Sequence, residues 1–240
     1  MRNCLIIASK EFRSYFRTPI AFVFLSVFLL VMGWMFFWVG NPPFFKRGIV
    51  EMRSFFGSLP FVFLFFIPAI SMRMWSEEKK LGTLETLLTM PIREGEVVVG
   101  KFLAGFGLLV VSFVLTLPIP IMLSMIGDPD FGPIWGGYIG SIFLGAAYLA
   151  IGLFASGLTE NQIVAFILGW AVSLLLFLIG YLQLQGLLPA SLEEIAHHLS
   201  LYTHFQSIQR GVLDSRDVVY YLSVIVFFLF LNARTVKHRR

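Results

Sequence analysis

The stretch FFGSLPFVFLFFIPAISMRMWSEEKKLGTLETLLTMPI, residues 55–92, joins a long apolar run to a cluster of charges. Its first part, Phe55–Met72, carries no charged side chain. A helix needs about 20 predominantly apolar residues to cross the hydrocarbon of a bilayer, and this part comes close to that length. Its second part, Ser76–Ile92, carries five charged side chains. The stretch therefore predicts a membrane-spanning helix followed by a segment outside the bilayer.

The whole chain repeats this alternation. Of its 240 residues, 58% are hydrophobic and only 13% are charged, whereas roughly a quarter of the residues of a soluble domain are charged. The composition predicts an all-α integral membrane protein, since a helix satisfies its backbone hydrogen bonds internally. Six runs are long enough to span: Pro19–Gly40, Phe55–Met72, Phe102–Ile126, Pro133–Gly157, Ile163–Leu182 and Val218–Leu231. Pro118 and Pro120 are expected to kink or break the third run near its outer end.

The basic residues between these runs predict the orientation. One side of the membrane receives 13 Lys and Arg residues, including those of both termini, and the other receives 5. Cytoplasmic segments carry the excess of basic residues, so both termini and the Ser76–Ile92 segment are expected in the cytoplasm. The net charge of +4 is spread over these gaps and forms no single patch, so no nucleic-acid partner is expected.

None of the six runs contains Asp, Glu, Lys, Arg or His. Ion-coupled transporters usually need ionisable groups at membrane depth, and an intramembrane enzyme needs converging polar groups. The sequence therefore favours a protein whose energy comes from outside the bilayer, and it disfavours a polar ion pore.

The Ser76–Ile92 segment is predicted to contain a helix end and a second, short helix. The first helix continues to Lys80 and ends at Gly82. Thr83 is then the expected N-cap of a helix over Leu84–Met90 that stops at Pro91. This helix has an apolar face of Leu84, Leu87 and Leu88, with Glu85 in its first turn. It is either a docking element for another protein or a solvated turn whose leucines fold back on the spans.

Three flanking features leave alternatives open. Residues 1–17 form either an amphipathic helix at the interface, ending at Thr18-Pro19, or a plain positively charged topology signal. The fourth run has small residues at helical spacing, which serve packing within the chain or a dimer contact. These small residues are Gly136, Gly137, Gly140, Ser141 and Gly145. The third feature is the segment 183–217, which is expected to hold one or two outer helices.

Two candidate sites are disfavoured. In the outer segment, Glu194, His197, His198 and His204 include metal-ligand residue types, but their spacings do not converge on one point, so no metal is expected. The stretch GEVVVGK, Gly95–Lys101, matches the start of a phosphate-binding loop. However, Phe102 stands where that motif needs Ser or Thr, and no strand precedes it, so Lys101 is interpreted as a topology charge. Cys4 is the one cysteine, which excludes an intrachain disulfide.

Three segments resemble the membrane subunits of ABC-2 type transporters, in the branch of the gliding-motility-associated permease. They are EEKKLGTLETLLTMPI followed by VVVGKFLA (residues 77–92 and 97–104), GLTENQIVAFILGW (157–170) and RGVLDSRDVVYYLSVIVFFLFL (210–231). The resemblance covers nearly the whole chain in order. It implies one transmembrane domain over 1–240, with six spans, an elbow helix at 1–18, a cytoplasmic coupling segment at 73–101 and an outer helical hairpin within 183–217.

The resemblance also implies a function and partners. The chain would be the permease subunit of an ATP-driven exporter in the bacterial cytoplasmic membrane. A separate ATPase subunit would bind ATP and Mg, and a second membrane subunit would complete a dimer. A non-transporting mechanotransmission or scaffold subunit is the alternative. The implied ATPase-coupling residues are Glu77, Glu78, Gly82, Thr83, Leu84, Glu85, Leu87, Leu88 and Pro91, with a second coupling loop of Thr159, Glu160, Asn161 and Gln162.

Overall fold

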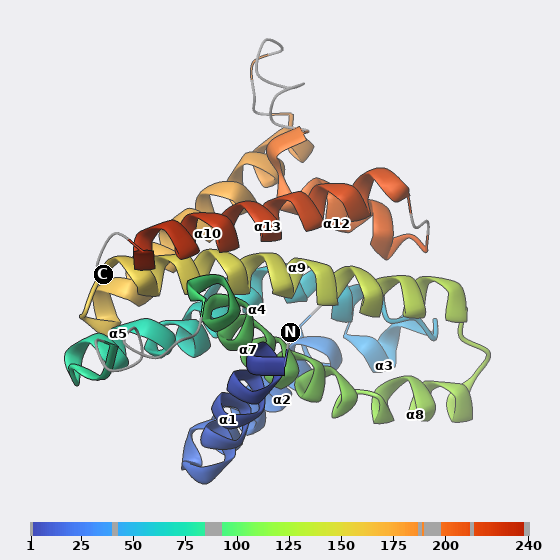
Figure 1. Cartoon of the computed structure of the whole chain (residues 1–240). Helices are drawn as coiled ribbons and strands as arrows, with labels where there is room; N and C mark the ends of the chain where they lie inside the picture. The colour runs from blue at the N-terminus through green and yellow to red at the C-terminus, as the bar shows by residue number, and fades with distance from the viewer. Residues whose placement is uncertain are drawn as a thin grey trace.

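All the regular secondary structure in the described part of the chain is helical. The computed structural model describes residues 2–39, 43–84, 93–186, 189, 198–211 and 214–237. Figure 1 shows the arrangement of the helices. They are α1 (Arg2–Arg17), α2 (Pro19–Phe37), α3 (Phe44–Arg47), α4 (Arg53–Ser71), α5 (Arg73–Lys80), α7 (Glu94–Val114), α8 (Pro118–Ile126), α9 (Phe131–Leu158), α10 (Gln162–Leu184), α12 (Leu201–Gln209) and α13 (Ser215–Lys237).

Six of these helical segments are long and apolar enough to cross a membrane: α2, α4 with α5, α7 with α8, α9, α10 and α13. Five of them contain the corresponding run found in the sequence, and α2 covers the first run only as far as Phe37, three residues short of the predicted end at Gly40. The all-α membrane fold with six spans is confirmed. The helices extend beyond several of the runs, and this brings ionisable residues such as Lys101 and Asp217 into them.

Helix α9 lies in the middle of the molecule, with α10, α12 and α13 on one side and α4 and α7 on the other (Figure 1). Its small residues allow this close packing. A Cβ at Gly137 would lie 2.4 Å from the ring of Phe56 on α4, and one at Gly145 would lie 2.7 Å from Leu109 on α7. Gly136 and Gly140 face Ile208 of α12 in the same way. The small residues of α9 therefore serve packing within the chain.

Proline residues mark two of the helix boundaries, as the sequence predicts. Helix α1 ends at Arg17 and α2 begins at Pro19. Helix α7 ends at Val114, and α8 begins at Pro118, whose missing N–H is tolerated at a first helical position. The third span is therefore broken where Pro118 and Pro120 predict it.

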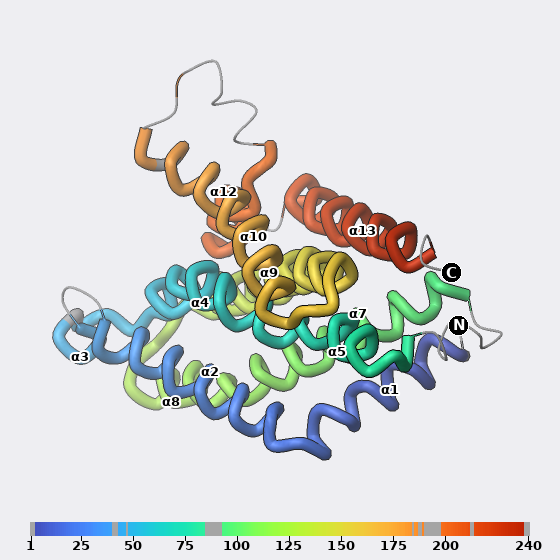
Figure 2. Tube along the Cα trace, turned by 90° about the vertical axis from the view of Figure 1, so that its left-hand side faces the viewer, coloured from blue at the N-terminus to red at the C-terminus, as the bar shows by residue number. Residues whose placement is uncertain are grey.

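The bundle has two ends that matter for function. At one end, on the left in Figure 1, lie α5, the last turns of α9 and the end of α13; we call it the α5 end. Helices α3 and α8 lie at the opposite end. Helix α1 packs along α7, and Figure 2 shows the start of α1 and the end of α13 on the same side of the molecule.

Candidate coupling site

Helix α5 is anchored to the end of α9 by Ser156. The first N–H groups of a helix have no partner within the helix itself. In α5, the N–H groups of Trp75 and Ser76 donate to Ser156 Oγ, at 3.0 and 3.2 Å. The same hydroxyl donates to the Met72 carbonyl, at 2.8 Å. A fully buried serine of α9 thus caps a helix whose first residue is far away in the sequence.

The other end of α5 also contacts α9. Lys79 donates from its ammonium to the carbonyl of Gly157 in the last turn of α9. The carbonyls of a last turn lack partners within their helix and carry partial negative charge, so a cation is favourable there. Helix α5 is therefore joined to α9 at both of its ends.

The predicted second coupling loop directly follows this contact. This loop connects α9 to α10, and two local hydrogen bonds hold its shape. The Asn161 N–H donates to Thr159 Oγ1 at 3.1 Å, and the Ile163 N–H donates to Asn161 Oδ1 at 2.9 Å. Asn161 is the N-cap of α10, and Gln162 is its first residue, while Glu160 is exposed. The structure thus brings the described parts of the two predicted coupling segments together at the α5 end.

A buried lysine joins α5 to two further helices. The side chain of Lys101 on α7 is only 2% exposed. Its ammonium lies 2.7 Å from Glu78 Oε1 on α5 and 3.2 Å from Glu11 Oε1 on α1. The ring of Trp75 lies 5.0 Å from the same ammonium, within the range of a cation–π interaction. Removing a charge from water is costly unless it is paired, so the two carboxylates are what allows Lys101 to be buried.

A cavity of about 310 Å³ opens beside this cluster, between α1, α4, α5 and α7. Glu78, Lys101 and Tyr15 line it. Burial raises the pKa of the Tyr15 hydroxyl, and the carboxylates of Glu11 and Glu78 raise it further. Arg73 and Glu77, at the rim, form a partly exposed i,i+4 ion pair at 3.3 Å, and pairs near the surface contribute little to stability.

The predicted coupling residues thus have different environments. Glu77 is partly exposed and faces Arg73, whereas Glu78 points inward to Lys101. Gly82 has a φ of +69°, the left-handed conformation that ends a helix, as the sequence predicts. Thr83 begins a helical segment and donates to the Glu78 carbonyl at 3.3 Å, and Leu84 is buried. Glu85, Leu87, Leu88 and Pro91 lie outside the described residues.

Sequence reasoning missed the contacts with which three residues hold α5 in place. Ser156 lies at the start of the segment that the family resemblance implies for the second coupling contact, about Ser156–Gln162, but nothing in its local pattern indicates that it caps α5. Glu11 is an ordinary polar residue of the N-terminal helix. Lys101 lies between two apolar runs, where basic residues usually set the orientation in the membrane. The structure corrects this interpretation of Lys101, because a side chain paired with Glu11 and Glu78 and closed off from solvent is a structural charge.

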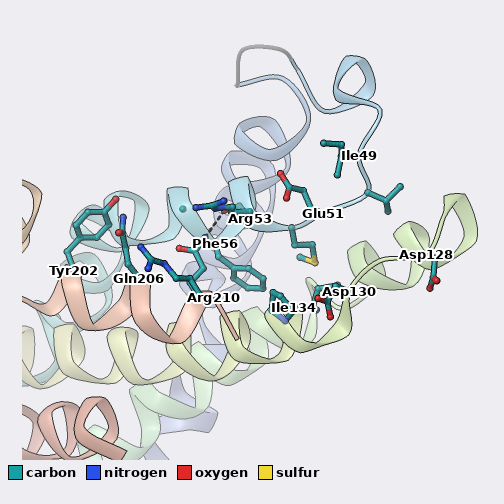
Figure 3. Close-up of a pocket in the computed structure, with 15 residues that line it drawn as sticks. Ile49, Glu51, Arg53, Phe56, Asp128, Asp130, Ile134, Tyr202, Gln206 and Arg210 are labelled. Atoms are coloured by element: carbon teal, nitrogen blue, oxygen red, sulfur yellow. Dashed lines mark hydrogen bonds between the residues drawn. The ribbon is translucent and has the colours of Figure 1, made fainter. Parts of the chain in front are cut away.

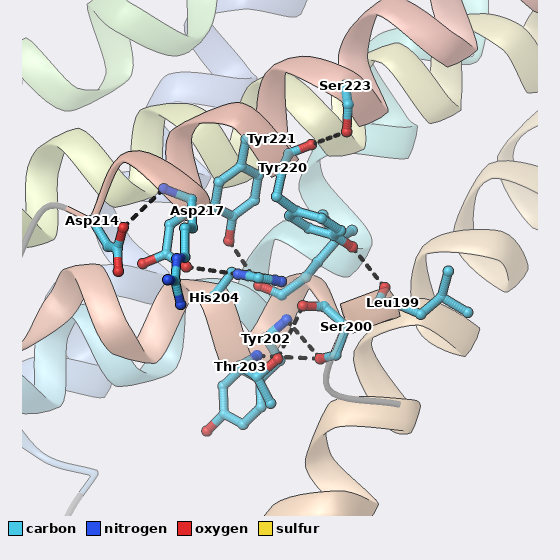
Figure 4. Close-up of polar contacts among 12 residues, drawn as sticks. Leu199, Ser200, Tyr202, Thr203, His204, Asp214, Asp217, Tyr220, Tyr221 and Ser223 are labelled. Atoms are coloured by element: carbon cyan, nitrogen blue, oxygen red, sulfur yellow. Dashed lines mark hydrogen bonds and ion pairs between the residues drawn. The ribbon is translucent and has the colours of Figure 1, made fainter. Parts of the chain in front are cut away.

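A second polar cluster joins α12 to α13 (Figure 4). His204 Nδ1 lies 2.6 Å from Asp217 Oδ1, and the Tyr220 ring stacks on the imidazole at 4.0 Å between centroids. Tyr221 donates to the Leu201 carbonyl at 2.7 Å, and Ser200 caps α12. His198 and His204 are the two residues of the disfavoured metal-site set that the structure describes. They have different environments, because His198 is exposed and His204 is buried.

Within the described ranges no group of three or more His, Cys, Asp or Glu residues is arranged to hold a metal. Glu194 and His197, the other two members of the predicted set, lie outside those ranges. The predicted outer hairpin is helical over α12. Its residues 190–197 lie outside the described ranges.

Comparison with known proteins agrees with this architecture. Residues 5–231 match the family described as ABC-2 family transporter protein. No curated protein gives a match. The family match covers all six candidate spans nearly completely, together with α5 and the α9–α10 loop. The chain therefore belongs to the ABC-2 transporter family and is a multi-pass membrane protein of the permease type.

Proposed function

We propose that this permease subunit couples ATP hydrolysis by a separate ATPase subunit to the movement of a cargo out of the cytoplasm. The observation that carries the proposal is the set of contacts made by α5. It is bonded to α9 through Ser156 and Gly157, and to α7 through the ion pair of Glu78 with Lys101. Lys101 in turn pairs with Glu11 of α1. A protein that pushes on α5 would therefore displace three other helices.

The geometry supports a mechanical form of coupling. Packed helices change between discrete arrangements because their interfaces do not deform continuously. A nucleotide in the partner can favour one arrangement only through contacts that differ between the two arrangements. In this proposal the ATPase makes those contacts with the segment after Gly82 and with the loop Thr159–Gln162. Helix α5, held between them and the spans, passes the displacement on.

Partners and location follow from the same proposal. Membrane subunits of this family work in general with an ATPase partner and a second membrane subunit. We place ATP and Mg in the ATPase subunit, and the α5 end with both termini in the cytoplasm, following the distribution of basic residues. The membrane is then the bacterial cytoplasmic membrane, and in this proposal the catalytic residues belong to the ATPase subunit.

The first test is to purify the chain with its genomic neighbours and to identify a nucleotide-binding subunit in the complex. Replacing residues 85–90 by a Gly/Ser linker of equal length, with the buried Leu84 kept, should abolish binding of that subunit while leaving the thermal unfolding midpoint of the spans unchanged. If the ATPase still binds the linker variant, the docking assignment is wrong.

The second test separates coupling from binding. In the reconstituted complex, ATP should change the hydrogen exchange of the α9–α10 loop. Lys79→Met should reduce this change because the bond to Gly157 is lost, whereas Lys80→Met, an equal change of charge at an exposed neighbour, should leave it unaltered. Equal effects of the two variants would contradict the proposed path. Uptake into inverted vesicles then distinguishes a transporter from a scaffold.

A further inference from the structure

A second and larger cavity, of about 710 Å³, lies at the end of the bundle opposite α5 (Figure 3). It is formed by the loop Ile49–Met52 with the start of α4, by the loop before α9 with the first turn of that helix, and by α12. Its volume falls within the range of about 300–1,000 Å³ that is typical of small-ligand sites. The proposed coupling function assigns no role to this cavity.

The floor of the cavity is apolar and one wall is polar. Met52, Phe56 and Ile134 line the floor and are 1–3% exposed. The wall is one face of the amphipathic helix α12, which turns Tyr202 and Gln206 to the cavity and packs its opposite face into the core. This wall is tied to α4, since Gln209 Nε2 donates to the Arg53 carbonyl at 2.8 Å.

The charged residues of the lining have both signs. Arg53 and Arg210 supply positive charge, while Glu51, Asp128 and Asp130 supply negative charge. Figure 3 shows Arg210 beside Gln206 and Tyr202 toward one side, and Asp128 and Asp130 toward the other. Among the residues that the structure describes, none of the five belongs to an ion pair within 4.0 Å. Asp130 is partly engaged, because its Oδ1 accepts from the Gly132 N–H at 3.0 Å.

Four of the five charged residues are exposed and Glu51 is half-buried, so the charges lie at the open side of the cavity. Their mixed signs make a simple ion a poorer occupant than a molecule that carries both charges. An anion bound to the arginines would be repelled by the three carboxylates, and a cation bound to the carboxylates would be repelled by the two guanidinium groups. A molecule that carries both charges, separated by a short linker, meets an opposite charge at each end. Specificity then arises from repulsion as well as attraction. The buried floor adds contact area for an apolar portion of the same molecule.

We propose that this cavity binds a zwitterionic amphiphile of the phosphoethanolamine type. Its phosphate would lie against Arg53 and Arg210, with fork-shaped guanidinium donors suited to phosphate oxygens. Its ammonium would lie against Asp128 and Glu51, and the adjoining apolar atoms would lie on Phe56 and Ile134. The chemistry is the same whether the ligand is a membrane lipid or a soluble molecule with this headgroup.

The test measures binding to the full chain in a non-ionic detergent. The probes are dihexanoyl phosphatidylethanolamine, dihexanoyl phosphatidylglycerol, which has the phosphate but no amine, and free O-phosphoethanolamine. We expect saturable binding of the first probe, at least tenfold tighter than that of the second. Free O-phosphoethanolamine binding as tightly as the lipid would support the site with a soluble ligand, and much weaker binding would support it with a lipid. Equal binding of the two lipids would overturn the proposal.

Charge variants provide the specificity control. Arg53→Gln with Arg210→Gln should weaken binding of the zwitterionic lipid at least tenfold. Arg216→Gln, the same change at an exposed arginine outside the cavity, should leave it unaltered. Glu51→Gln with Asp128→Asn should instead invert the preference in favour of phosphatidylglycerol, an outcome that misfolding does not produce. If this last variant still preferred phosphatidylethanolamine to phosphatidylglycerol, the proposed ligand would be wrong.

Discussion

The ammonium of Lys101 lies 2.7 Å from the carboxylate of Glu78, and this ion pair joins the third span to the helix that follows the second. Glu11 adds a second carboxylate from α1. The lysine is almost completely buried, while the two acids are each about one-quarter exposed. The acids therefore compensate the lysine more than the lysine compensates them, and this asymmetry can be tested.

Replacing both acids should be far more damaging than replacing the lysine. In the double variant Glu11→Gln and Glu78→Gln, the buried ammonium of Lys101 has no counter-charge. Breaking a buried pair by removing the partner typically costs about 3–5 kcal/mol. Adding Lys101→Met to the double variant should recover most of that loss, since no unpaired charge remains buried. The measurement is thermal unfolding in detergent, and strictly additive effects of the three substitutions would contradict this account.

Ser156 should contribute more than a second buried serine of the same helix. Ser156→Ala removes the acceptor of two N–H groups of α5 and should cost about 1–2 kcal/mol, the usual effect of losing a helix cap. The matched control is Ser141→Ala. Ser141 is equally buried, but it donates only to the Gly137 carbonyl of its own helix, so its loss should be nearly neutral. Equal destabilisation of the two variants would show that Ser156 does not stabilise the chain as a cap of α5.

Gly152 should tolerate no larger residue. A Cβ at this position would lie 2.0 Å from Ser71 Oγ and 2.9 Å from Ser71 Cβ, so Gly152→Ala forces α4 and α9 apart. Overpacking of this kind typically costs about 1–3 kcal/mol. Ser71→Gly in the same chain should restore the contact and much of the stability. Gly33→Ala is the control, because a Cβ there meets no atom within 4 Å. A neutral Gly152→Ala would show that the two helices pack less closely than described.

Cys4 should report on the packing of α1 against α7. The thiol is buried, and burial raises its pKa. Since the thiolate is the reactive form and a higher pKa reduces its fraction at pH 7, maleimide should label native Cys4 at least tenfold more slowly than a free cysteine. Raising the pH should increase the rate.

A variant at Gly100 completes this experiment. A Cβ at Gly100 would lie 2.8 Å from Ile7 Cβ and 3.0 Å from the Cys4 carbonyl, so Gly100→Val should displace α1 and accelerate labelling. Gly95→Val changes the same helix where a Cβ meets nothing within 4 Å, and it should leave the rate unchanged. Fast labelling of the unaltered chain would mean that α1 is not held against α7.

Much of the fold was predictable because it depends on local composition. A run of about 20 apolar residues is stable across a bilayer whatever its neighbours are, and six such runs predicted six spans. The helix boundaries at Pro19, Pro118 and Gly82 follow from backbone geometry that is equally local. The coupling residues beyond Leu84 and the elbow role of α1 stay predictions, as does the place of the chain in the gliding-motility branch.

What only the tertiary structure decided is which side chains meet at the α5 end. Lys101 reaches Glu11 and Glu78 across 90 and 23 residues of sequence, and Ser156 caps Trp75 across 81. Such contacts depend on how each helix is rotated about its axis and where it crosses its neighbours. Shape and small residues in the packed interfaces set these quantities, and in lipid no hydropathy pattern along a single helix encodes them. The sequence determined six apolar runs and predicted a charged segment outside the membrane after the second, whereas the packing of α9, α7 and α1 determined what holds α5 in place.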